Sequence, residues 1–388
     1  MSKVTLSVIK ADVGSIGGHT EPSKPMMEVI HNRLRKAVEE GKLIDALATH
    51  TGDDIALLMS HRGGVGDAQV HQFAWEGFLA ATEIAKDAGL YGAGQDLLVD
   101  APSGNIRGAG PAVAEIEFER DPKCKHRPAE AFLVLAADKA GPGAYNYPLY
   151  SVFCDPMHNG GLLLSPKLHL GFTLTIIDMD HKAKDSDRVI RLDVPERSWD
   201  VAALLQNPDR FAVEAIHSRC QPEEQVVSVS ATRLHNIAGK YTGKDDPVSI
   251  VRVQGIFPAP EEVVEPYILG HFISGDARGS HVMPLMPVAI NTPVAGPYCL
   301  PIVSCLAFSM DARGAFARSR VDIFGNVVWD ATRLKIQQKA DEWRRQGFIG
   351  PTMAAQAELA YTGIVDTLAA LDKEFTLRKE QPVADDDD

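Results

Sequence analysis

Residues 114–119 read Ala-Glu-Ile-Glu-Phe-Glu, so apolar and acidic side chains alternate along this stretch. A β-strand points successive side chains to opposite faces, so Ile116 and Phe118 would face a core while the glutamates would face water. The same alternation recurs in residues 172–176. The pattern predicts antiparallel sheets that are packed on one face and wet on the other.

Other strands and helices extend this pattern over the chain. Further strands are expected at residues 4–12, 43–51, 55–60, 131–137, 225–230 and 248–253. Two amphipathic helices are expected early in the chain, one starting at Pro25 with an apolar face of Met27, Ile30, Leu34 and Val38, and one ending before Gly89 with a face of Val70, Ala74, Phe78 and Ala81. Two long helices are expected near the end, at about residues 332–346 and 353–375.

The order of these elements predicts the fold class. Strands far outnumber regular strand-helix-strand crossovers, so we expect an α/β fold of the α+β type, with layered, largely antiparallel sheets covered by helices. A doubly wound parallel sheet is disfavoured for the same reason. Because the breaks include no repeat and no low-complexity linker, we expect one domain over residues 1–380 and a disordered acidic tail over residues 381–388.

Composition is that of an ordinary globular protein. The 388 residues are 45% hydrophobic and 23% charged, with a net charge of −13. This acidity argues against a nucleic-acid surface and suits a protein that recruits cations. Five cysteines include no Cys-x-x-Cys pair, which favours neither a zinc site nor a disulfide framework. Since no signal-peptide pattern or membrane-spanning stretch is found, we expect a cytoplasmic protein that binds no membrane.

Residues 239–247, Gly-Lys-Tyr-Thr-Gly-Lys-Asp-Asp-Pro, concentrate reactive side chains in one loop. Lys244 can form a Schiff base with a carbonyl, and Tyr241 can transfer a proton. Asp245 and Asp246 can hold a divalent cation. A solvated turn is the alternative interpretation, because Gly, Asp and Pro all favour turns.

Acidic residues also occur where other expected strands end. Asp53 and Asp54 lie at the tip of a predicted hairpin, and Asp138, followed by Lys139, ends a fully apolar run. Asp12 ends the first alternating strand and precedes a flexible Gly-rich segment that carries His19. The recurrence predicts a site lined by carboxylates from several strand ends.

Two motifs point to other chemistry. An apolar strand that ends in Asp178-Met179-Asp180 is how haloacid-dehalogenase-type phosphatases present a nucleophile, but Lys182 stands where a small hydroxylated or β-branched residue is expected two places later, which favours a strand leading into a polar turn. Residues 103–110 offer free amides and an arginine that could cradle a phosphate, and they fit a plain glycine-rich loop equally well.

Seven blocks together are specific to one family. They are residues 8–14 (VIKADVG), 50–54 (HTGDD), 91–98 (YGAGQDLL), 136–139 (AADK), 142–146 (PGAYN), 239–247 (GKYTGKDDP) and 278–281 (RGSH). In this order they closely resemble the bifunctional fructose-1,6-bisphosphate aldolase/phosphatase family of archaea and deep-branching bacteria, over nearly the whole chain. The resemblance implies a four-layer α-β-β-α sandwich, dependence on several Mg²⁺ ions, a role in gluconeogenesis and a homo-octamer.

The resemblance also implies roles for individual residues. Lys244 would be the Schiff-base lysine, Tyr241 the proton donor and acceptor of the aldolase, and Asp12 the base that activates water. The implied magnesium ligands are Asp12, His19, Asp53, Asp54, Gln95, Asp138, Asp245 and Asp246. The implied substrate contacts are His19, Tyr91, Ser103, Gly104, Asp138, Lys139, Arg278 and Tyr361.

The implied reaction sequence has two halves in one catalytic domain. Glycerone phosphate, held by Lys244 as an iminium, would condense with glyceraldehyde 3-phosphate, and the 1-phosphate of the resulting fructose 1,6-bisphosphate would then be hydrolysed. One departure is visible, since Ala295 stands where the family pattern leads us to expect an aspartate before Gly-Pro. A magnesium-dependent sugar phosphatase without aldolase activity and a non-catalytic sugar-phosphate-binding protein are the alternatives.

Overall fold

The computed structural model describes most of the chain. Described residues are 2–97, 110–120, 130–179, 189–206, 208, 210–230, 245–274, 282–294, 300–316 and 320–345. The predicted helix 353–375 and acidic tail 381–388 lie outside them. In the described part, no helix is long and apolar enough to cross a membrane.

Strands and helices follow one another along the whole described chain. The strands are β1 Ser2–Asp12, β2 Asp45–Thr51, β3 Asp54–His61, β4 Ala112–Arg120, β5 Glu130–Asp138, β6 Phe172–Asp178, β7 Val189–Val194, β8 Phe211–Ser218, β9 Gln225–Val229, β10 Val248–Val253, β11 Phe272–Ser274, β12 Val282–Pro284, β13 Met286–Pro287, β14 Ile302–Met310 and β15 Val321–Asp322. The α-helices are α1 Lys24–Glu39, α2 Ala68–Asp87, α3 Asn146–Cys154, α4 Gly160–Leu164, α5 Ser198–Leu205, α7 Pro260–Val264 and α8 Asp330–Arg344. Short 3₁₀ helices are η1 Gln95–Leu97, η2 Glu265–Leu269 and η3 Val327–Trp329.

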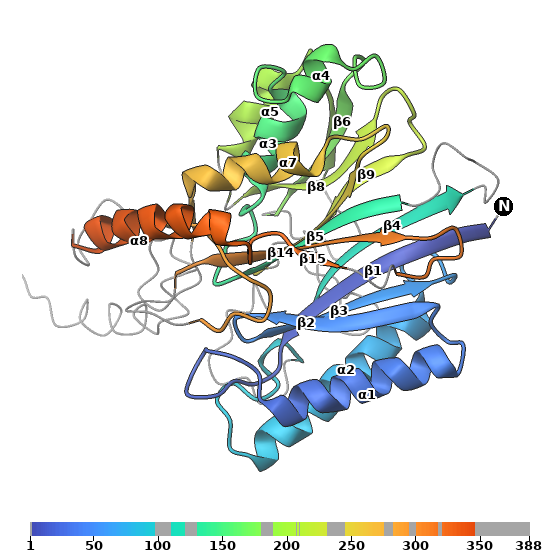
Figure 1. Ribbon diagram of the computed structural model, residues 1–388, viewed down its shortest axis with the longest axis vertical. Helices are drawn as coiled ribbons and strands as arrows, with labels where there is room; N and C mark the ends of the chain where they lie inside the picture. The colour runs from blue at the N-terminus through green and yellow to red at the C-terminus, as the bar shows by residue number, and fades with distance from the viewer. Residues whose placement is uncertain are drawn as a thin grey trace, which may run out of the picture.

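The smaller sheet has the strand order β2-β3-β1-β4, and all its pairs are antiparallel. Helices α1 and α2 cover one of its faces (Figure 1). Side-chain oxygens of Ser23 and Asp67 accept backbone N–H groups in the first turns of α1 and α2, respectively, which fixes where each helix begins. The predicted apolar face of α2 is buried; in α1, Met26 and Ala37 are buried where Met27 and Val38 were expected.

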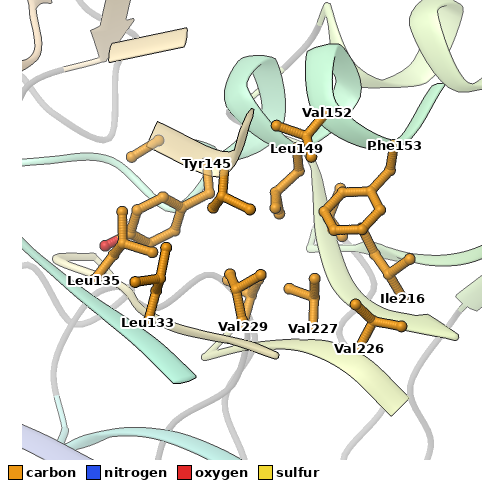
Figure 2. Close-up of a cluster of buried hydrophobic side chains, with 14 of the residues drawn as sticks. Leu133, Leu135, Tyr145, Leu149, Val152, Phe153, Ile216, Val226, Val227 and Val229 are labelled. Carbon is orange, nitrogen blue, oxygen red and sulfur yellow. The ribbon is translucent and has the colours of Figure 1, made fainter. Parts of the chain in front are cut away.

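The larger sheet has the order β13-β14-β5-β10-β9-β8-β6-β7, with β15 paired to β14. Its pairs are antiparallel except β13 with β14. Helices α3, α5 and α7 pack on its outer face through a continuous apolar cluster. Figure 2 shows this cluster, in which Leu149 and Phe153 of α3 lie over Val227 and Ile216 of the sheet.

The remaining faces of the two sheets pack against each other. Leu6 and Val8 of β1 share one buried cluster with Val134 of β5 and Ile250 of β10. The layers therefore run helices, smaller sheet, larger sheet, helices (Figure 1). The prediction of largely antiparallel sheets covered by helices is confirmed.

The prediction of a wet face on the strand at residues 114–119 is wrong for Glu115. Glu115 is 8% exposed, because the loop after β3 and helix α2 cover it. Its Oε1 accepts hydrogen bonds from Ser7 Oγ (2.6 Å) and from His71 Nε2 (3.1 Å), and its Oε2 accepts one from Gly66 N (2.7 Å). Three donors replace the water that the sequence pattern led us to expect. Glu119 is exposed, as predicted.

Arg252 of β10 is the largest of the fully buried side chains. Its Nη2 donates to Glu130 Oε2 at 3.1 Å, its Nη1 to Glu224 and to the Gln225 carbonyl at 3.1 Å. The guanidinium also lies 4.5 Å from the ring centroid of Phe257. A buried cation held in this way joins β10 to both of its neighbouring strands.

Replacing Arg252 by alanine is expected to lower the free energy of unfolding by about 3–5 kcal/mol, because the buried carboxylate of Glu130 would lose the guanidinium that donates to it. The matched control is Arg313→Ala, since Arg313 is mostly exposed in its pair with Asp311 and should cost roughly 0–1 kcal/mol. Denaturant unfolding followed by circular dichroism measures both changes. Equal losses in the two variants would contradict this account.

Candidate functional site

Carboxylates from both sheets meet at one edge of the sheet-to-sheet junction. Asp12 ends β1 and pairs in register with Asp54, the first residue of β3, while Asp53 lies in the turn between β2 and β3. From the larger sheet, Asp138 ends β5 and Asp246 lies two residues before β10. All five are at most 8% exposed. The carboxylates predicted from separate strand ends are thus brought together.

Hydrogen bonds between loops hold the two sheets in this alignment. Thr51 Oγ1 and Ser304 Oγ are 2.6 Å apart, which ties the β2–β3 hairpin to β14. Gly52 N donates to the carbonyl of Thr292 at 2.9 Å. Ala137 N donates to the carbonyl of Pro247 at 3.1 Å, which places Asp246 beside the end of β5.

One group of possible metal ligands consists of Asp12, His19 and Asp53. One ligand atom from each lies within 4.8 Å of the others. His19 Nδ1 is 3.1 Å from Asp53 Oδ2 and 3.8 Å from Asp12 Oδ2. The His19 ring also packs edge-on against Tyr91, with centroids 4.8 Å apart, and Tyr91 is 38% exposed.

A second group consists of Asp54, Asp138 and Asp246, whose ligand atoms also lie within 4.8 Å of one another. Ala140 N donates to Asp246 Oδ1 at 2.8 Å, and Asp53 N donates to Asp138 Oδ2 at 3.3 Å. Asp246 has φ of 52°, a left-handed conformation that costs energy for a residue with a side chain. The backbone is therefore held in place around the carboxylates.

Lys139 connects the two groups. Its Nζ donates to Asp53 Oδ1 at 2.6 Å and to Asp138 Oδ1 at 2.8 Å. Burial would lower the pKa of Lys139, but the surrounding carboxylates outweigh burial and hold this pKa well above its ordinary value. The ammonium therefore stays charged and partly offsets the negative charge of the cluster.

The pKa values of several carboxyl groups at this site are shifted, because the groups are buried and close together. Burial, reinforced by neighbouring carboxylates, raises the pKa of Asp12 well above its usual range. Burial also raises the pKa of Asp138 well above its usual range, and that of Asp54 to about 7 although Lys10 opposes the shift. For Asp53 burial acts in the same direction, but Lys139 and His19 outweigh it and lower the pKa.

The donor set fits divalent cations. Several buried carboxylates at one place repel each other, and cations relieve that repulsion. Oxygen donors predominate, with one imidazole, and hard cations such as Mg²⁺ or Mn²⁺ prefer oxygen. Gln95 Oε1 is buried without a hydrogen-bond partner in the described part of the chain, which leaves it able to serve as a further ligand. Asp245 is buried beside Asp246.

Two residues at the site were missed by sequence reasoning. Lys10 is 1% exposed, and its ammonium donates to Asp54 Oδ2. Asp96 Oδ2 accepts the backbone N–H of Asp12 at 2.9 Å, which places the turn at η1 against the end of β1. Lys10 could have been found because it is a charged residue at a position where the alternation of the strand predicts an apolar one. Asp96 could have been found because it directly follows Gln95, which was expected to be a metal ligand.

Some of the predicted residues lie outside the described part of the chain. They are Ser103, Gly104, Tyr241, Lys244, Arg278, Ala295 and Tyr361.

Asp178, the first residue of the motif that is similar to haloacid-dehalogenase-type phosphatases, is the last residue of β6. Arg210 donates to its carboxylate through Nε at 3.1 Å and through Nη2 at 3.0 Å. That pairing gives Asp178 a structural role.

A cavity of about 710 Å³ lies away from the carboxylates. Its lining includes Lys42, Arg62, Phe73 and His61, the last residue of β3. Since Asp54 begins that strand, roughly 23 Å of extended chain separates the two places. The cavity is not part of the acidic site.

Fold and site together define a layered, largely antiparallel protein whose two sheets enclose buried carboxylates suited to divalent cations. A family model described as fructose-1,6-bisphosphatase matches residues 3–376. Proteins named fructose-1,6-bisphosphate aldolase/phosphatase are similar over nearly their full length. The chain is 53% identical to the one from Thermus thermophilus (96% of this chain and 100% of the relative covered) and 42% identical to the one from Cenarchaeum symbiosum (97% and 96%). It is also 42% identical to the one from Ignicoccus hospitalis (98% and 95%).

The chain belongs to the fructose-1,6-bisphosphate aldolase/phosphatase family. This confirms the resemblance that the seven sequence blocks indicated.

Gly52→Ala is expected to abolish divalent-cation binding, because the added Cβ would lie 1.6 Å from Asp138 Oδ2. Gly41→Ala is the matched control, since Gly41 also has a positive φ (72° against 57°) but no atom within 4 Å of the added Cβ. Both variants carry the same backbone strain of roughly 1–2 kcal/mol, and only Gly52→Ala disturbs the carboxylates. Titration calorimetry with Mn²⁺ on folded protein compares them. If Gly52→Ala binds Mn²⁺ with the affinity of the wild type, the assignment of these carboxylates as cation ligands is wrong.

Proposed function

We propose that the chain joins glycerone phosphate to glyceraldehyde 3-phosphate and then hydrolyses the 1-phosphate of fructose 1,6-bisphosphate, giving fructose 6-phosphate and phosphate. The observation that carries the proposal is the pair of buried carboxylate groups, one of which includes Asp246 of the 239–247 motif, in a chain whose relatives are named for both activities. Because the hydrolysis in the second step is irreversible, it would draw the two reactions toward fructose 6-phosphate, which is the direction that gluconeogenesis requires.

The hydrolytic half would use the described carboxylates. Asp12, Asp53, Asp54, Asp138 and Asp246 would hold Mg²⁺, with Gln95, His19 and Asp245 as further candidates. Magnesium, when bound, would offset the charge on phosphate oxygens and lower the pKa of a water.

Asp12 would accept the proton of an attacking water. Gly14 N donates to its Oδ1 at 3.1 Å and orients the carboxylate. The backbone N–H of Asp12 donates to Asp96, which holds the main chain at this position. Lys139, whose ammonium lies between Asp53 and Asp138, would contact a phosphate oxygen. His19 and Tyr91, which retain exposure beside Asp12, would contact the substrate.

The aldol half would use Lys244 as the Schiff-base lysine and Tyr241 as the proton carrier. Lys244 immediately precedes Asp245 and Asp246 in sequence, and both of these aspartates are buried. A lysine beside two carboxylates stays protonated and is then not nucleophilic. Cation binding that neutralises the aspartates would remove this obstacle, so the two halves of the reaction would be coupled through the same charges.

The remaining parts of the proposal concern assembly and substrate contacts. Exposed apolar side chains lie on the helical layer of the larger sheet, with Trp199 at 85%, Met157 at 83% and Leu164 at 79%. They support an oligomer, and we propose a cytoplasmic homo-octamer. Ser103, Gly104, Arg278 and Tyr361 are proposed to complete the substrate contacts.

Lys244→Ala is expected to abolish phosphate release from the two triose phosphates while keeping hydrolysis of fructose 1,6-bisphosphate within about threefold of the wild type. Lys240→Ala, which removes the other lysine of the same segment, should keep both activities. A colorimetric phosphate assay with Mg²⁺ measures each reaction. Borohydride reduction with glycerone phosphate should add mass to the peptide containing Lys244.

If wild type and Lys244→Ala both hydrolyse the bisphosphate and neither uses the trioses, the chain is a sugar phosphatase and the Lys244 assignment is wrong. If the wild type binds the bisphosphate without hydrolysing it, the chain is a sugar-phosphate-binding protein.

A further inference from the structure

Lys10 lies where the fold would otherwise place an apolar residue. It follows Leu6 and Val8 on the face of β1 that packs against the larger sheet, and it is 1% exposed. Removing an ammonium from water costs several kcal/mol unless it is well paired. Its partner is Asp54 Oδ2. This placement puts a buried positive charge next to the carboxylate of Asp54.

The ammonium restricts how Asp54 can bind a cation. A carboxylate has two oxygens and can chelate one ion with both of them. Because Lys10 already donates to Oδ2, a cation chelated by both oxygens of Asp54 would share that oxygen with the ammonium and lie beside its positive charge, so binding through Oδ1 alone is favoured. A similar restriction holds for Asp246, because Ala140 N donates to its Oδ1 at 2.8 Å.

We propose that Lys10 determines the cation specificity of the site by keeping Asp54 a single-oxygen ligand, which favours a small octahedral ion over Ca²⁺. Ca²⁺ takes six to eight oxygens and accepts two-oxygen carboxylates, whereas Mg²⁺ requires near-ideal octahedral geometry. Lys10 is the donor in this set best suited to test the idea. Ala140 donates through its backbone, and Lys139 is a proposed substrate contact.

The inference rests on the proposed function in one respect, that the carboxylates bind divalent cations. The measurement is the dissociation constant of Mg²⁺ and of Ca²⁺, by titration calorimetry, for wild type and Lys10→Met. Methionine keeps the length of the side chain and removes its charge and donors. Loss of a positive charge strengthens binding of both ions alike, so the ratio of the two constants isolates the geometry.

The ratio is expected to shift toward Ca²⁺ by at least about tenfold in Lys10→Met. Lys3→Met is the matched control, since Lys3 lies on the same strand in an exposed pair with Glu117, and its ratio should equal the wild-type ratio. An unchanged ratio in folded Lys10→Met overturns the inference. If the wild type binds neither ion, the proposed metal site itself fails, which is a different outcome.

A second variant tests the idea if Lys10→Met does not fold. Asp54→Asn keeps one oxygen acceptor and cannot chelate, so it should weaken both ions with the Mg²⁺ to Ca²⁺ ratio within about threefold of the wild type. A tenfold or larger selective loss of Ca²⁺ binding would show that Asp54 uses both oxygens, and the inference would be wrong.

Discussion

Mutual repulsion among buried carboxylates is the constraint on which this structure depends. Asp12, Asp53, Asp54, Asp138 and Asp246 are removed from water at one edge of two packed sheets. Burial and like charge both disfavour the ionised forms of Asp12, Asp54 and Asp138, and the raised pKa of each reflects this cost. Two buried lysines and several backbone N–H groups oppose the repulsion without removing it. Divalent cations would complete the compensation, and the carboxylates are arranged to bind them.

The layered fold supplies the stability that this cluster of buried charges requires. Apolar clusters on both faces of each sheet hold the strands in register, so the loops at their ends need little stability of their own. Lys139 and Asp246 adopt left-handed backbone conformations within those loops. Such strain persists where the surroundings fix it and is concentrated at functional sites. Gly52 has the same conformation where a side chain could not fit beside Asp138.

Sequence patterns predicted much of the fold because the relevant signals are local. Alternation along β1 and β6, the helical face of α2, and the carboxylates at the β2–β3 turn were all visible in short windows. Patterns could not predict which segments cover a sheet face. Glu115 was therefore expected in water, although Ser7, His71 and Gly66 supply its donors from elsewhere in the chain. Lys10 was missed for the same reason, since its partner Asp54 lies on another strand. The residue roles came from family resemblance, because periodicity does not encode chemistry.

Anomalous scattering from crystals soaked in Mn²⁺ tests the central claim most directly, since it places the cations without reference to activity. The account predicts peaks within contact of Asp54, Asp138 and Asp246 and of Asp12, His19 and Asp53. Soaked crystals that show manganese only at other surfaces, with Asp54 still bonded to Lys10 and with Asp53 and Asp138 still bonded to Lys139, would contradict it.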